Sequence, residues 1–136
     1  MHLVPNVWAT LVAGAIFWVL GAIWYAGLFG KMYQSALKLS AEEMEKAKKN
    51  FPKALVVHFL CGIVAAYVIG RIVKAAGCTG FGQGIWIGLW VWLGFTVTLF
   101  LVATMFERYL MKMFWINNGF YIIAYAIMGG VMSAWQ

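Results

Sequence analysis

The feature that most constrains this chain is a set of four apolar stretches, each about 20 residues long or slightly more. They cover roughly residues 7–29, 54–76, 84–106 and 114–135, and they are nearly free of charged side chains. At about 1.5 Å per residue, a helix of about 20 residues crosses a hydrocarbon core of about 30 Å. Backbone groups in lipid must be satisfied within the segment, and the alternation that a β-barrel needs is absent. The sequence therefore predicts an all-α, integral membrane four-helix bundle in one domain.

Composition and charge exclude the main alternatives. Hydrophobic residues make up 65% of the 136 residues and charged residues 10%, whereas soluble domains average roughly 45–50% apolar and about 25% charged. A soluble domain of this size could not bury so much apolar surface. Six of the ten basic residues lie between Lys31 and Lys53, together with three of the four acidic residues. This clustering is typical of a membrane surface and argues against a nucleic-acid partner.

The connection between the first two apolar stretches is long and charged. Ser40 and Glu43 have the spacing of a capping box, and they precede glutamates followed by lysines, an order that suits the helix dipole. We expect a short amphipathic helix over residues 40–50, which either lies on the membrane surface or forms a solvated hairpin. Asn50 and Pro52 then predict the start of the second spanning helix, as a cap and a first-turn proline.

The basic residues also predict the orientation. Two connections, between the first and second and between the third and fourth stretches, carry eight of them: Lys31, Lys38, Lys46, Lys48, Lys49, Lys53, Arg108 and Lys112. The opposite side has only Arg71 and Lys74. The positive-inside rule therefore predicts a cytoplasmic location for the charged loop and an outside location for both termini.

Short motifs in a fixed order extend over nearly the whole chain. They are Trp24-Tyr25, Leu28-Phe29-Gly30-Lys31, Ser40-Ala41-Glu42-Glu43-Met44, Trp92-Leu93-Gly94-Phe95, Phe106-Glu107-Arg108, Ile116-Asn117, Gly119-Phe120-Tyr121, Met128-Gly129-Gly130 and Ala134-Trp135. In order and spacing the chain resembles the bacterial membrane family catalogued as domain of unknown function 1761. The resemblance implies four transmembrane helices in a bacterial cytoplasmic membrane, and it implies no established activity.

Small residues recur at intervals of four in three of the predicted helices. The candidate packing positions are Gly62, Ala66, Gly70, Gly84, Gly88, Ala126 and Gly130. Such spacing lets helices approach closely in lipid. It predicts a tight bundle and is compatible with an oligomer, although packing within one chain is the simpler explanation.

Polar residues within the spans are few, so each is a candidate for function. His58, Thr104, Glu107, Asn117 and Asn118 are predicted at similar depth, near the cytoplasmic face. Together they could hold a proton, a cation or a polar headgroup. The simpler interpretation, which we favour, is a hydrogen-bonded network between the second, third and fourth helices.

Two tryptophans, Trp86 and Trp90, are one helical turn apart and form a candidate aromatic face. Such a face could bind an apolar or cationic ligand through its rings. It could equally face lipid or a protein partner, which is the interpretation we favour.

No catalytic machinery is evident, and no catalytic residue, metal site or cofactor is predicted. Two cysteines exclude zinc and iron–sulfur ligand spacings, and no carboxylate pair lies within a span. We expect a non-enzymatic membrane protein that acts through helix packing, as a homo-oligomer or as an accessory subunit of a larger membrane complex. The alternative is a minimal dimeric transporter or channel for a small cationic or apolar solute. A lipid-modifying enzyme with His58 as base is the least favoured.

Overall fold

The computed structural model describes residues 3–107 and 110–136, and in this part of the chain it contains helices and no strands. Four helices are long and apolar enough to cross a membrane: Val7–Leu28, Ala41–Ala75, Phe81–Phe106 and Met111–Ala134. The predicted all-α, four-helix architecture is therefore confirmed. Arg108, one of the residues behind the predicted orientation, lies outside the described residues.

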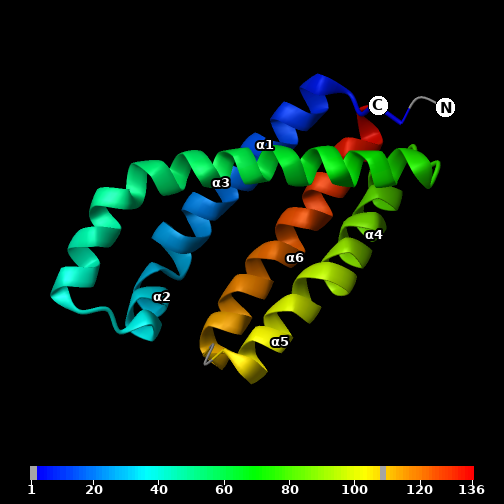
Figure 1. Cartoon of the computed structure of the whole chain (residues 1–136). Coiled ribbons are helices and arrows are strands. Elements are labelled where there is room, and N and C mark those ends of the chain that lie inside the picture. Colours follow the sequence, from blue (N-terminus) through cyan, green and yellow to red (C-terminus); the bar gives the residue numbers. More distant parts are fainter. Residues whose placement is uncertain (1–2, 108–109) are drawn as a thin grey trace.

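The elements follow one another in a simple order. They are α1 (Val7–Ala22), η1 (Ile23–Leu28), α2 (Gly30–Leu37), α3 (Ala41–Ala75), α4 (Phe81–Val91), η2 (Trp92–Val97), α5 (Thr98–Phe106) and α6 (Met111–Ala134). In Figure 1, α6 runs antiparallel beside α4 and α5, and α3 crosses α1, α6 and α4 obliquely. The chain ends and the turn between α3 and α4 lie at one end of the bundle, and α2 lies toward the other.

The boundary expected near Asn50 is wrong, because α3 is continuous from Ala41 to Ala75 and contains Pro52 in its interior. The predicted capping box is present at its start, where Ser40 N donates to Glu43 Oε2 at 2.9 Å and Glu43 N donates to Ser40 Oγ at 3.2 Å. A helix that is well capped and rich in helix-forming residues tolerates the loss of the one backbone hydrogen bond that a proline removes. The predicted amphipathic helix is thus the exposed first part of α3, and Figure 1 shows this part at an angle to the rest.

Two spanning helices contain a turn of π-helix, which the sequence did not predict. η1 ends the first span and η2 interrupts the third. In η1 the backbone N–H of Phe29 reaches the carbonyl of Trp24, five residues back, at 2.8 Å. A π-turn is wider than an α-turn and often occurs beside functional sites. Here η1 changes the direction in which Tyr25 and its neighbours project.

The closest helix contact joins α4 to α6 through their backbones. A Cβ placed on Gly84 would overlap the carbonyl oxygen of Gly129, and one placed on Gly88 would overlap that of Tyr125 and come within 3.0 Å of the Ala126 Cα. Direct backbone packing of this kind is the interaction that small residues permit in a membrane. The glycines predicted from their spacing therefore lie at a helix interface within the chain.

The other predicted small residues also lie between helices. Gly62, Ala66 and Gly70 of α3 are buried. A Cβ on Gly62 would meet the ring of Phe17 at 2.8 Å, and one on Gly130 would meet the ring of Phe81 at 2.7 Å. These positions thus seat large side chains from neighbouring helices, and the core forms around them.

We predict that Gly84→Ala destabilises the protein, whereas Gly82→Ala does not. The added methyl group at residue 84 has no room against α6, and overpacking of a core typically costs about 1–3 kcal/mol. Gly82 is exposed, and no neighbouring atom lies within 4 Å of the place that a methyl group would take there. Alanine at this position should therefore gain up to about 1 kcal/mol from helix propensity. The free energy of unfolding in detergent micelles measures both effects. Equal values for the two variants would contradict a close α4–α6 contact.

Candidate functional site

A cavity of about 860 Å³ lies in the half of the bundle next to α2. Its walls come from the end of α1, from η1 and α2, from α3 and from the first half of α6, with one side chain from α5. Eight of the lining residues carry rings: Trp18, Tyr25, Tyr33, Phe51, His58, Phe100, Phe120 and Tyr121. A volume in this range, with mostly apolar walls, is typical of small-molecule sites. We refer to it as the ring-lined cavity.

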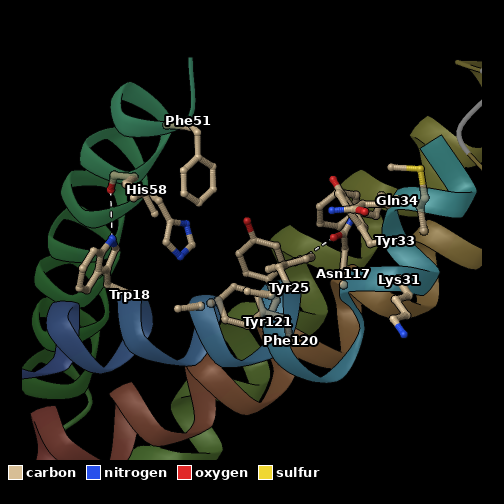
Figure 2. Close-up of a pocket in the computed structure, with 18 residues that line it drawn as sticks. Trp18, Tyr25, Lys31, Tyr33, Gln34, Phe51, His58, Asn117, Phe120 and Tyr121 are labelled. Carbon is tan, nitrogen blue, oxygen red and sulfur yellow. Dashed lines mark hydrogen bonds between the residues drawn. The ribbon is translucent and has the colours of Figure 1, made fainter. Parts of the chain in front are cut away.

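Hydrogen bonds between segments distant in the sequence connect the walls of the cavity. The indole N–H of Trp18 donates to the carbonyl of Leu55 at 3.1 Å and so joins α1 to α3. The hydroxyl of Tyr25 donates to Asn117 Oδ1 and joins η1 to α6 (Figure 2). Outside the cavity, the indole of Trp24 makes a parallel link to α6. Interhelical bonds in membranes average about 0.6 kcal/mol each, so their main effect is to fix the geometry of the walls.

Packed rings form the floor of the cavity. Phe120 is 1% exposed, and its ring centroid lies 5.1 Å from that of Phe17, 5.4 Å from that of Tyr25 and 5.0 Å from that of Tyr121. Tilted and edge-on arrangements at these distances are favourable for aromatic pairs. The floor is consequently a rigid apolar surface.

His58 enters the cavity wall from α3. Its ring lies 4.6 Å from the ring of Phe17 and 6.0 Å from that of Phe120, between centroids. The Nε2 atom is buried against the backbone of Gly21, where a Cβ would overlap it. Within the described residues Nε2 makes no hydrogen bond of normal geometry, although the backbone of Phe17 lies close enough to interact with the imidazole. Gly21 is thus the position that makes room for His58.

The predicted polar cluster is divided by the structure. His58 and Asn117 both line the ring-lined cavity, whereas Thr104, Glu107 and Asn118 do not. The Thr104 hydroxyl donates to the Phe100 carbonyl at 2.8 Å, and Asn118 Nδ2 donates to the Phe114 carbonyl at 2.9 Å, each within its own helix. Glu107 is exposed just after the end of α5. Similar depth therefore did not bring these side chains together.

The cavity contains little charge. Lys31 is its one charged lining residue within the described chain, and neither aspartate nor glutamate contributes to the walls there. In Figure 2 the ammonium of Lys31 points away from the space between His58 and Tyr25. Burial raises the pKa of the Tyr33 phenol above its ordinary value, so this side chain, in α2 and outside the spanning helices, is neutral at physiological pH.

The predicted aromatic face lies elsewhere. The side chains of Trp86 and Trp90 are 65% and 64% exposed, on the outer side of α4. Neither residue lines the ring-lined cavity. Their position leaves them available to lipid or to a protein partner.

Sequence reasoning missed most of the cavity. Trp18, Phe51 and Phe120 are aromatic residues in apolar helices, and nothing in the sequence separates a ring that lines a cavity from one that faces lipid. Tyr25 and Tyr121 offered a usable signal, since a phenol within a span needs a hydrogen-bond partner. Among the described residues no group of three histidine, cysteine, aspartate or glutamate side chains is arranged to hold a metal ion.

Comparison with known proteins gives one match. The sequence model of the family described as "Protein of unknown function (DUF1761)" matches residues 8–133. The chain belongs to this family. The match includes the four spanning helices of this DUF1761 protein, apart from the end residues Val7 and Ala134, and every residue that lines its cavity. Neither a curated protein nor a solved structure matches the chain.

Proposed function

We propose that this DUF1761 protein is a non-enzymatic membrane protein that binds a small apolar or amphipathic molecule in its ring-lined cavity. The observation that carries the proposal is the cavity itself: about 860 Å³, lined largely by rings and open at the surface of the bundle, in a chain of 136 residues. A space of this size with rigid aromatic walls is suited to a ligand.

The lining chemistry favours binding over catalysis. No serine, cysteine, aspartate or glutamate is among the described lining residues, so these walls hold no Ser–His–Asp or Cys–His arrangement. The absence of a carboxylate from them also favours an apolar solute over a cationic one, for which the walls offer no counter-charge. A minimal transporter would also have to bind its solute first, so transport of an apolar solute is compatible with the proposed binding function.

The cavity has an opening suited to a ligand from the bilayer. Ala22 of α1, Ala26 of η1 and Ala54 of α3 line the cavity and are also exposed. Small side chains at these three positions leave this part of the cavity open at the surface of the bundle. An apolar molecule dissolved in the membrane could therefore enter from the side.

We predict that Ala22→Phe abolishes ligand binding, whereas Ile23→Phe preserves it. Ala22 lines the cavity, so a phenylalanine there fills part of the ligand space. Because Ala22 is also exposed, the larger side chain should not disturb the fold. The neighbouring Ile23 is exposed and does not line the cavity. The assay is saturable energy transfer from tryptophan to the neutral dye N-phenyl-1-naphthylamine, with purified protein in nanodiscs. We expect at least a tenfold weaker apparent affinity for Ala22→Phe. Saturable transfer that is equal in both variants and in the unmodified protein would refute binding in the cavity.

A second candidate is association with other copies or with a larger membrane protein. Phe81–Phe106 is the least buried span, with 11% of its most apolar window buried, against 50% for Met111–Ala134. Trp86 and Trp90 project from this span. A face of this kind would serve a homo-oligomer or an accessory subunit.

For this candidate we predict that Trp86→Ala with Trp90→Ala reduces association at least fivefold, whereas Trp8→Ala leaves it unchanged. Trp8 is the matched control, since its side chain is 68% exposed on α1. Native mass spectrometry of gently extracted protein measures the fraction in a complex. A monomer that is unaccompanied before any substitution would exclude this role.

We also propose that the protein lies in a bacterial cytoplasmic membrane with both termini outside, as the lysine-rich side indicates. Cys78, in the turn between α3 and α4, should then react with an impermeant maleimide on intact cells carrying Cys61→Ala. Ser35→Cys in a background without native cysteines is the control, and it should react only after lysis, because Ser35 is an exposed residue of α2. The reverse pattern of labelling would invert the topology.

A further inference from the structure

The ring-lined cavity also indicates which class of molecule it takes, an inference that rests on the proposed binding function. Its walls present flat aromatic surfaces from α1, η1, α3, α5 and α6 around one space. Flat surfaces of this kind gain most from a ligand that is itself a ring, because offset and edge-on ring pairs are favourable beyond the area that they bury. A flexible chain would gain only the area term. The walls therefore favour a planar ring compound.

The charges of the lining residues restrict the class of ligand further. The central space, between His58 on one side and the Tyr25–Asn117 pair on the other, has no carboxylate among its described lining residues, and the ammonium of Lys31 points away from it (Figure 2). An ion placed there would lose its hydration without a compensating partner. The lining therefore favours a neutral ring over a charged one.

Polar groups at two sides of the space favour a ring with polar atoms at opposite edges. His58 approaches from α3, with Nε2 turned to Gly21 and its other ring nitrogen on the opposite side of the imidazole. The Asn117 amide and the Tyr25 phenol, joined by a hydrogen bond, approach from α6 and η1. Between them lie the apolar rings of Phe120 and Tyr121. Imidazole, amide and phenol groups all form hydrogen bonds with carbonyl or hydroxyl oxygens.

The last feature of the ligand follows from the opening lined by Ala22, Ala26 and Ala54, through which an apolar tail could extend toward the surrounding lipid. We infer that the cavity is a binding site for a quinone or quinol, a neutral ring with oxygens at opposite edges and an apolar tail. The ring lies between His58 and Asn117, and the tail leaves past the three alanines.

The test uses decylubiquinone as the probe and the full chain in lipid nanodiscs, with binding followed by quenching of tryptophan fluorescence. We expect saturable quenching that Asn117→Leu weakens at least tenfold, whereas Asn118→Leu leaves it within twofold. The two asparagines are adjacent and both buried, at 7% and 4% exposure, but only Asn117 lines the cavity. Thermal unfolding of each variant shows that it is folded. If Asn117→Leu does not fold, Ala26→Phe, at an exposed lining position, takes its place with the same expected loss.

Other probes separate failure of this inference from failure of the proposed function. Oleate is an anionic chain, and tetraphenylphosphonium is a cation with aromatic rings. If the protein binds either probe saturably but does not bind decylubiquinone, the quinone assignment is wrong. If Ala22→Phe also abolishes the binding of that probe, the cavity is still a binding site. If none of the three binds, both proposals fail. Saturable decylubiquinone binding that Asn117→Leu and Asn118→Leu affect equally would place the quinone outside the cavity and would also overturn the inference.

Discussion

Direct contact between the backbones of α4 and α6 determines how the rest of the bundle is arranged. No hydrophobic force draws helices together within lipid, so close van der Waals packing has to supply much of the association energy. Gly84, Gly88 and Gly129 allow that packing because their neighbours occupy the positions where side chains would be. With one side of α6 packed on α4, other sides of it contact α1 and α3, and Ala124 is fully buried.

The cavity follows from a change in residue size along the bundle. Near the chain termini small residues predominate between the helices, and Gly70 of α3 is packed against Pro5 and Met132. Toward α2, rings predominate at the contacts, and η1 widens the first spanning helix. At this end large rings hold the helices apart, whereas at the other end small residues let them approach closely. The same sequence thus produces a dense end and an end with room for a ligand.

The sequence predicted the parts of this fold that depend on the solvent and on local chemistry. The spans follow from the need to satisfy backbone groups in lipid, and the helix start at Ser40 follows from two reciprocal hydrogen bonds with Glu43. The continuity of α3 was missed because Pro52 is compatible with a first helical turn and also with the interior of a well-supported helix. The π-turns have no recognised signature in a single sequence.

Candidate site residues were harder to group because depth along a helix is only one of two coordinates. His58, Thr104 and Asn117 are at comparable depth, but Thr104 bonds to its own helix and only the other two line the cavity. The second coordinate, the direction around the helix axis, depends on which neighbour each helix packs against. That choice is made by contacts such as Gly21 against His58, which involve residues distant in the sequence.

The unbroken course of α3 has a mechanical consequence. Its first turns expose Lys46, Lys48 and Lys49, and the following turns supply Phe51 and Leu55 to the cavity wall. One continuous helix therefore joins the exposed lysines to the cavity wall, with no loop between them. Pro52 removes a single backbone bond between the lysines and Leu55, which makes that turn the most compliant point of the helix. Any movement of the lysine-bearing turns relative to the rest of α3 is thus concentrated next to the cavity residues Phe51 and Leu55.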